Sequence, residues 1–296
     1  MSASSLTTAE ILTQPDCWQR AAELAPDLSR QLPAPGERVA VIGCGTSWFM
    51  AQSYAALREQ HGHGETDAFA ASEFPAGRRY DRVLALTRSG TTTEVLRTCT
   101  HLRGRVPVTA ITADPHTPVM DAADQVAVLD FADEQSVVQT RFATTALALL
   151  RAHLGEDLTA AIADARAALT DPLAPQALTA EQVTFLGTGW TYGLAQEAAL
   201  KMREAAGAWT EAYPAMEYRH GPISITGPGR VTWSFGPLPE GLAENVAAVG
   251  GHLECRPSAD PLADLVRAQR LAVAIAESKG YDPDRPRNLT RSVILT

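Results

Sequence analysis

The stretch RVAVIGCGTSWFMAQSYAAL (residues 38–57) joins a short apolar run, a glycine-containing turn and a segment that is apolar at helical spacing. An apolar run bounded by glycine predicts a buried strand, and the spacing after it predicts a helix that covers the strand. The same succession returns in QVTFLGTGWTYGLAQEAALKMREAAG (residues 182–207), with Gly187 standing 144 residues after Gly43. This repetition predicts two α/β halves of similar design.

Around these two stretches, the expected strands and helices alternate. Strands that alternate with helices predict a doubly wound parallel sheet of flavodoxin-like type in each half, and the second half is expected to be abbreviated after residue 230. The expected strands lie within residues 38–45, 66–74, 82–90, 106–115 and 125–134, and the expected helices within residues 7–32, 46–62, 91–105 and 137–155. The expected division is a helical segment at 1–37, a first domain at 38–170, a second domain at 171–280 and a tail at 281–296.

The composition of the 296 residues is that of a globular protein, with 45% hydrophobic and 20% charged residues. The formal net charge of −9 argues against nucleic acid as the main partner. Four cysteines lie far apart without metal-ligand spacing, so we expect reduced thiols of a cytoplasmic protein and no metal site. We expect neither a signal peptide nor a membrane-spanning segment, because no apolar run of about 18 residues is present.

The segment LALTRSGTTTEVL (residues 84–96) is the most informative part of the first half. An expected strand ends at Thr87-Arg88-Ser89, and a helix is expected directly after Gly90 and three threonines. Five hydroxyl side chains, backbone N–H groups at a helix start and the helix dipole together favour binding of an anion such as phosphate. Hydroxyl residues are also common helix caps, so a purely structural role is the alternative.

Two nucleotide-binding motifs are absent. The loop lacks the G-x-x-x-x-G-K-[ST] pattern, so nucleotide hydrolysis is not expected. The turn Gly43-Cys44-Gly45-Thr46-Ser47 lacks the third glycine of G-x-G-x-x-G, so a dinucleotide is not expected either, and no cofactor is predicted. Its last two residues add hydroxyls at a second strand-to-helix turn.

The segment EAALKMREAAGAWTEAYPAMEYRHGP (residues 197–222) carries the expected acid–base residues. Glu197, Lys201 and Glu204 stand at helical positions i, i+4 and i+7, so they share one face of the expected helix. Because apolar residues flank them, we expect limited access to water and a carboxylate able to take a proton from a carbon beside a carbonyl. A solvated stripe of ion pairs is the alternative.

His220 stands in EYRHGP, where Gly221-Pro222 ends any helix, so it is expected on a turn that can reach a ligand. A structural histidine is the alternative. The C-terminal stretch DPDRPRNLTRSVILT (residues 282–296) holds Arg287 and Arg291 close to the end of the sequence. Taken alone, these two arginines would be a solvated basic end.

The motifs GCGTS, TRSGTTTE, EAALKMRE, EYRHGP and DPDRPRNLTRSVIL follow one another in the order found in SIS (sugar isomerase) family proteins. The chain resembles this family from about residue 38 onward, and in particular the isomerase half of glucosamine-6-phosphate synthases. Each motif is short, and SGTT alone is weak, but the series is specific. The resemblance implies two SIS-type halves and a phosphorylated hexosamine as substrate.

The resemblance also implies roles for individual residues. Glu204 moves a proton between C1 and C2 of the sugar, with Lys201 nearby. His220 assists ring opening in the active site of the neighbouring subunit, which implies a homodimer with shared active sites. The tail covers the substrate, which gives Arg291 a place at the site. The implied phosphate contacts are Thr87, Ser89 and Thr92 with Ser47 assisting, and Thr46, Arg88, Gln139 and Glu197 are further candidate substrate contacts.

Three departures from the synthases argue against ammonia transfer. No glutaminase half is expected ahead of residue 38. Arg291 stands where the synthase tail has a lysine that forms a Schiff base with the ketose, and a guanidinium cannot form that imine. Gln139 replaces a serine expected among the substrate contacts. A synthase that transfers ammonia is therefore not expected.

The expected reaction begins with Glu204 taking the C2 proton of an opened (N-acetyl)hexosamine 6-phosphate, while Arg291 stabilises the developing oxyanion. β-Elimination of water from N-acetylglucosamine 6-phosphate is the favoured outcome, because arginine clamps oxygens well but transfers protons poorly. An isomerase or deaminase of glucosamine 6-phosphate, or of a related aldose or ketose phosphate, is the alternative. A non-catalytic sugar-phosphate sensor is a second alternative, although a sensor would not need Glu204 and His220.

Overall fold

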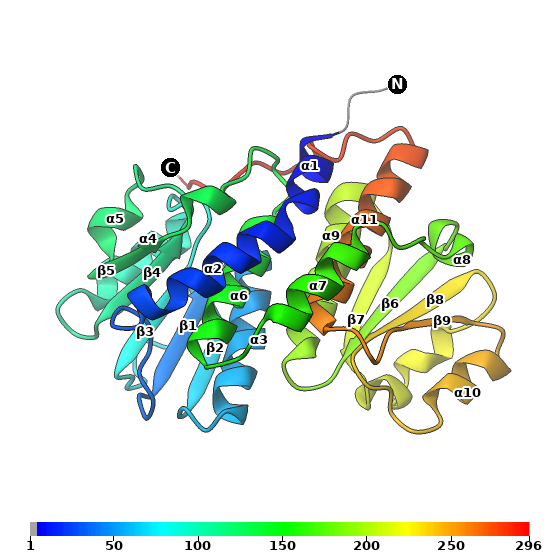
Figure 1. Cartoon of the computed structure of the whole chain (residues 1–296), viewed down its shortest axis with the longest axis horizontal. Helices are drawn as coiled ribbons and strands as arrows, with labels where there is room; N and C mark the ends of the chain where they lie inside the picture. Colours follow the sequence, from blue (N-terminus) through cyan, green and yellow to red (C-terminus); the bar gives the residue numbers. More distant parts are fainter. Residues whose placement is uncertain (1–4, 296) are drawn as a thin grey trace. The chain divides into compact units, whose positions relative to one another are not determined.

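The computed structural model describes residues 5–295 and contains two parallel β-sheets, each flanked by helices (Figure 1). The described chain divides into two compact units, and each unit is built around one sheet. Each unit draws on segments that are far apart in the sequence. The first unit consists of residues 16–135, 141–158 and 290–295, and the second of residues 5–15, 136–140 and 159–289.

The first unit holds a five-stranded sheet in the order β2-β1-β3-β4-β5, and every pair of neighbouring strands is parallel. This is the flavodoxin-like order expected from the sequence. Its strands are β1 (Val39–Gly43), β2 (Thr66–Ala70), β3 (Arg82–Leu86), β4 (Val108–Thr112) and β5 (Gln125–Val128). Its helices are α2 (Gln14–Leu28), α3 (Thr46–Gln60), α4 (Thr93–Leu102), α5 (Val119–Ala122) and α6 (Arg141–His153), with short 3-10 turns η1 (Ala71–Glu73) and η2 (Asp130–Ala132).

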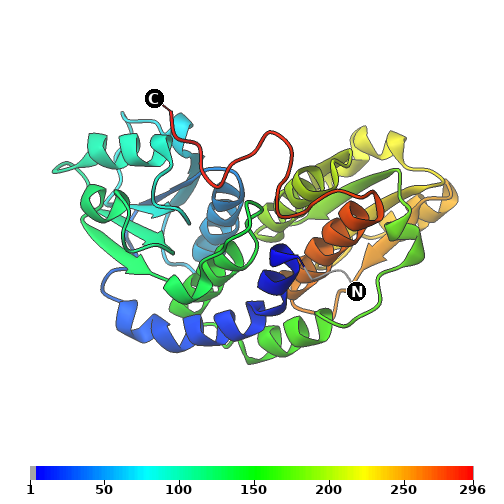
Figure 2. The ribbon, with the colours of Figure 1, turned by 90° about the horizontal axis from the view of Figure 1, so that it is seen from above.

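Both faces of this sheet are buried. Side chains of a strand alternate between the two faces, and Ala40 and Ile42 of β1 belong to an apolar cluster that also holds residues of α4 and α5. The intervening residues Val39 and Val41 are fully buried as well, so they face a second helical layer. That layer includes α3, which packs against β1, β2 and α6 (Figure 2).

The second unit holds a four-stranded parallel sheet in the order β7-β6-β8-β9. Helix α9 packs against β6 and β7, and the long helix α11 packs against α9 and α7. Its strands are β6 (Gln182–Gly187), β7 (Thr210–Pro214), β8 (Arg230–Phe235) and β9 (His252–Cys255). Its helices are α1 (Leu6–Leu12), α7 (Thr159–Ala168), α8 (Pro175–Leu178), α9 (Thr191–Ala206), α10 (Leu242–Ala248) and α11 (Pro261–Ser278), with 3-10 turns η3 (Glu217–Arg219) and η4 (Pro222–Ile225).

The two sheets confirm the predicted pair of related halves. Strand order β7-β6-β8-β9 matches the first four strands of the other sheet, β2-β1-β3-β4, and the second sheet lacks a fifth strand. Gly43 and Gly187 end the corresponding strands β1 and β6. A Cβ atom on Gly43 would lie 2.7 Å from the backbone of Ser47, and one on Gly187 would lie 2.3 Å from that of Thr191. Both positions therefore require glycine because the following helix starts against the strand.

Some predicted bounds were too long. The strand predicted within residues 125–134 ends at Val128 and is followed by η2, and the helix predicted within 137–155 begins only at Arg141. The segment between β5 and α6 is itself partly buried, so its apolar residues extend the pattern of the strand and of the helix. The domain bounds expected from the repeat stay a prediction, since the compact units divide the chain at more places. Across residues 5–295, every helix is too short or too polar to cross a membrane.

Candidate active site

Two hydroxyl-bearing turns lie at the carboxyl edge of the first sheet. Thr46 and Ser47 begin α3 directly after β1, and Thr87 and Ser89 follow β3; all four side chains are buried. Strands β1 and β3 are parallel neighbours, so both turns leave the sheet at the same edge. Ligands of open α/β sheets bind at this edge. The structure thus gathers these predicted residues within the first unit, together with the N-cap residue Thr92.

The loop between β3 and α4, residues 87–92, has hydroxyl groups that are available to bind an anion. The hydroxyl of Thr87 is buried and has no hydrogen-bond partner among the described residues. Thr92 is the N-cap of α4, and its side chain makes no capping hydrogen bond. The backbone N–H of Thr91 donates to the hydroxyl of Ser89 over 3.2 Å. A buried hydroxyl without a partner is uncommon, and it is explained here if a bound ligand completes the site.

The C-terminal segment 290–295 lies against this loop within the first unit. The backbone N–H of Thr93 donates to the carbonyl oxygen of Val293 over 3.2 Å, and Leu295 N–H donates to the Thr93 hydroxyl over 2.9 Å. The hydroxyls of Thr91 and Ser292 are 2.9 Å apart. The tail is therefore held in place by hydrogen bonds at the start of α4, and it does not fray away from it.

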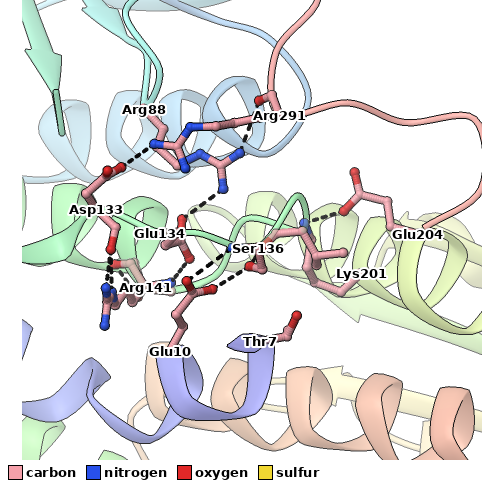
Figure 3. A network of polar contacts seen from close by, with 12 residues as sticks. Thr7, Glu10, Arg88, Asp133, Glu134, Ser136, Arg141, Lys201, Glu204 and Arg291 are labelled. Atoms are coloured by element: carbon pink, nitrogen blue, oxygen red, sulfur yellow. Dashed lines mark hydrogen bonds and ion pairs between the residues drawn. The ribbon is translucent and has the colours of Figure 1, made fainter. Parts of the chain in front are cut away.

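Two arginines predicted at the site form ion pairs with two acidic residues that the sequence reasoning did not single out. Arg88, which is buried, lies 3.3 Å from Glu134 and donates to the carbonyl oxygen of Arg291 over 3.1 Å (Figure 3). The guanidinium of Arg291 lies 2.5 Å from the carboxylate of Asp133. Glu134 also accepts a hydrogen bond from the backbone N–H of Arg141. The sequence did contain a signal for these partners, since Asp133 and Glu134 stand at the carboxyl end of the strand predicted within residues 125–134.

Three of the four charged residues on helix α9 of the second unit form one cluster. Lys201 Nζ lies 3.5 Å from Glu197 and 2.5 Å from Glu204. The side chains of Glu197 and Lys201 are each 1% exposed, whereas that of Glu204 is 18% exposed. The predicted shared face and limited water access are thus present in the structure. Glu204 is thus the more exposed carboxylate of this cluster, and Lys201 is an ammonium held beside it.

Cys44 lies in the glycine turn that precedes Thr46, and its chemistry follows from burial. Burial, together with a smaller effect of the nearby carboxylate of Glu94, raises the pKa of this thiol to about 11. The group is therefore a neutral thiol at physiological pH and a poor nucleophile. No group of three or more potential metal ligands occurs within the described part of the chain.

Two further predicted residues, His220 and Gln139, also belong to the second unit. His220 follows η3, is exposed, and its ring makes no hydrogen bond or ion pair with any described residue, Glu204 and Lys201 included. Gln139 lies in the short segment 136–140 of the second unit. That segment is anchored by Ser136, whose backbone N–H and hydroxyl both donate to the buried carboxylate of Glu10 in α1 (Figure 3).

Comparison with known proteins finds similar sequences and structures among aminotransferases and a deaminase named for sugar phosphates. No protein-family model matches the sequence. The glutamine–fructose-6-phosphate aminotransferase of Sulfurisphaera tokodaii is 27% identical over 295 residues, which cover 88% of this chain and 50% of that protein. The solved C-terminal domain of the glucosamine–fructose-6-phosphate aminotransferase of Francisella tularensis superposes with a TM-score of 0.78 at 21% identity, covering 96% of this chain and 99% of that one. The chain is a homologue of the isomerase (SIS) domain of these aminotransferases.

A SIS protein outside the aminotransferases has the same fold. The structure of glucosamine-6-phosphate deaminase from Thermotoga maritima superposes with a TM-score of 0.80 at 23% identity, covering 98% of this chain and all of that one. The family resemblance and the SIS fold expected from the motifs are confirmed. The chain spans about half the length of the curated aminotransferases it matches.

Proposed function

We propose that this SIS protein is a phosphosugar enzyme of the isomerase or deaminase type that acts on a hexosamine 6-phosphate, with glucosamine 6-phosphate as the first candidate substrate. The observation that carries the proposal is the buried ammonium of Lys201, 2.5 Å from the partly exposed carboxylate of Glu204. Such a pair holds a base and an acid side by side, as proton transfer between neighbouring atoms of a sugar requires. The hydroxyl-rich loop at the start of α4 supplies a site for the phosphate.

In the proposed reaction, Glu204 removes the C2 proton of the open-chain aldehyde while the C1 oxygen takes up a proton, which gives an enolamine. Return of a proton to C1 gives a 2-imino sugar. Water adds to this imine and ammonia leaves, so that glucosamine 6-phosphate and water become fructose 6-phosphate and ammonia. Lys201, hydrogen-bonded to Glu204, keeps that carboxylate oriented and serves as a local proton donor. The same proton movements on a 2-hydroxy sugar are a simple aldose–ketose isomerisation.

Elimination of water from N-acetylglucosamine 6-phosphate is the second candidate. It is favoured by Arg291, a fixed cation in the segment beside the hydroxyl-rich loop and suited to stabilising an oxyanion. We rank it second because the carboxylate of Asp133, 2.5 Å away, already neutralises part of that charge. The N-acetyl group would also prevent imine hydrolysis, so elimination would be the reaction that converts the deprotonated N-acetyl sugar into a product.

The proposed active site includes His220 from a neighbouring subunit. His220 is exposed and its ring has no partner among the residues that the structure describes, so it is available to a second copy of the chain. A homodimer with shared sites is therefore part of the proposal. Mixing His220→Ala and Glu204→Gln protomers tests it, since one wild-type site would be restored in mixed dimers and some activity would return.

The first experiment is proton NMR of the purified protein with glucosamine 6-phosphate in heavy water. Deamination predicts loss of the C2 proton signal, deuterium at C1 of the product and release of ammonium. A parallel sample with N-acetylglucosamine 6-phosphate predicts a new olefinic C3 proton if elimination is the reaction. Binding of either sugar without any proton exchange would instead favour a sensor, and the enzyme proposal would be abandoned.

A further inference from the structure

A cavity of about 520 Å³ lies beside the C-terminal end of α9, entirely within the second unit. One wall is the last turn of α9, with Arg203 and Glu204, and the other is the segment 280–289 that follows α11. The carboxylate of Glu204, proposed above as the catalytic base, therefore borders this cavity.

Three guanidinium groups line the cavity, although the chain as a whole carries a net charge of −9. Arg285 makes no side-chain hydrogen bond or ion pair with any residue of the described chain. Arg287 stacks on the ring of Tyr281 at 4.7 Å, and Arg203 donates to the carbonyl oxygen of Thr210 over 3.3 Å. At least one cation is thus without a counter-ion at this wall.

The acidic groups of the lining are already engaged. The carboxylate of Glu204 is hydrogen-bonded to Lys201, and that of Asp282 accepts the backbone N–H of Asp284 over 2.9 Å. The lining holds three guanidinium groups and two carboxylates, so its positive charge exceeds its negative charge by one. Guanidinium groups bind carboxylates and phosphates through paired hydrogen bonds.

The wall formed by segment 280–289 is held in place by helix α1. The carboxylate of Asp284 accepts hydrogen bonds from the backbone N–H groups of Leu6 and Thr7, each 2.8 Å long, and from the Thr7 hydroxyl at 2.7 Å. Lys279 Nζ donates to the carbonyl oxygen of Ala206 at the end of α9 over 3.3 Å. Both walls are thus fixed before a ligand arrives, which reduces the entropy lost on binding.

We propose that this cavity binds a small organic anion, a carboxylate or a phosphate, through Arg285 and Arg287, directly beside Glu204. The position of the bound anion next to the reacting carbons of the sugar rests on the proposed function. Binding of the anion to the cavity does not depend on that function. The anion has two possible sources, which share this chemistry: a substituent of the substrate itself, or a separate metabolite that binds as an effector.

Labelling with phenylglyoxal tests the proposal on the intact wild-type protein, with inorganic phosphate as the probe and mass spectrometry to resolve each arginine. We expect phosphate to lower the labelling rates of Arg285 and Arg287 at least severalfold. Arg79 is the internal control, because it is exposed, has no partner in the described chain and lies in the first unit. Equal labelling with and without phosphate, or equal protection of Arg79, would overturn the proposal.

A second arm separates the two sources of the anion. If the substrate supplies it, glucosamine 6-phosphate also protects Arg285 and Arg287, and the Arg285→Gln/Arg287→Gln variant has a KM raised about tenfold or more. If an effector supplies it, the sugar leaves both arginines reactive and phosphate changes the wild-type rate without competing with the sugar. An inactive wild-type protein would count against the proposed function alone, since the labelling needs no turnover.

Discussion

Helices α3 and α9 follow the same strand and glycine turn in the two halves, yet they bury different chemistry. The face of α9 that carries a lysine between two glutamates corresponds to a face of α3 that has no ionisable residue at these positions. A shift of 144 residues pairs Glu197 with Ser53, Lys201 with Leu57 and Glu204 with Gln60. The duplicated scaffold therefore positions a helix twice, and only one copy carries a lysine between two glutamates on this face.

The strand-to-helix loops show the opposite distribution. The loop after β3 (residues 87–92) has four hydroxyl residues, whereas the corresponding loop after β8 reads GPLPEG (residues 236–241) and has none. One half thus holds the candidate phosphate site and the other half holds the candidate base. This division teaches that the repeated strand-and-turn pattern specifies the fold, while the residues that differ between the copies specify the chemistry.

The largest expected effect comes from replacing Glu204 of α9 by glutamine, the residue at the corresponding position 60 of α3. Glu204→Gln should lower kcat by about 10²–10⁴-fold with glucosamine 6-phosphate, because the amide cannot accept the C2 proton. Steady-state release of ammonium measures the loss. The matched control is Gln60→Glu, which makes the reverse change at the corresponding position of α3 and should leave kcat within about twofold. Equal losses in the two variants would mean that α9 has no special role.

The next expected effect is on stability, at the centre of the α9 cluster. Lys201→Leu removes the ammonium between two carboxylates, and an uncompensated buried charge should lower the free energy of unfolding by about 3–5 kcal/mol. Urea denaturation measures the change. The triple variant Glu197→Ser/Lys201→Leu/Glu204→Gln carries the α3 residues and should recover most of the loss while remaining inactive. A triple variant no more stable than the single one would show that the cluster does not act through charge.

A smaller effect is expected in the hydroxyl-rich loop. Ser89→Ala should raise KM for glucosamine 6-phosphate about tenfold, since a hydrogen bond to a charged group is worth about 1.5–3 kcal/mol, and should leave kcat within about twofold. The control is Thr188→Ala, which removes an exposed hydroxyl from the turn after β6 in the other half. If kcat fell and KM did not change, the loop would not be the phosphate site.

The smallest effect concerns the turns that follow the two helices, where His63 after α3 corresponds to Gly207 after α9. Burial lowers the pKa of His63 from its usual 6.5, and Arg58, His61 and His153 lower it further. The unfolded chain therefore binds more protons than the folded one just below pH 6.5, so His63 makes stability fall as the pH drops through this window. His63→Gln should flatten the decline seen by thermal unfolding between pH 7 and 5, while the exposed His116→Gln should not. An unchanged slope in His63→Gln would contradict this account.

The sequence predicted most of the fold and part of the candidate site. Apolar runs bounded by glycine located the strands, and helical spacing located the shared face of Glu197, Lys201 and Glu204, since both patterns depend on near neighbours. Element ends were less accurate, as at β5 and α6, because buried connections keep the apolar composition of the elements they join. The roles of the site residues stay predictions that the experiments above address.

The sequence by itself determined the duplicated α/β architecture, the hydroxyl-rich loop at a helix start and the charged face of α9. Only the tertiary structure decided the partners of Arg88, Arg291 and Asp284, which lie 46, 158 and 277 residues away in the chain. The physical reason is that local periodicity fixes which way a side chain points along its own helix or strand. Which distant group it then meets depends on how sheets and helices pack, and no short stretch of sequence contains that information.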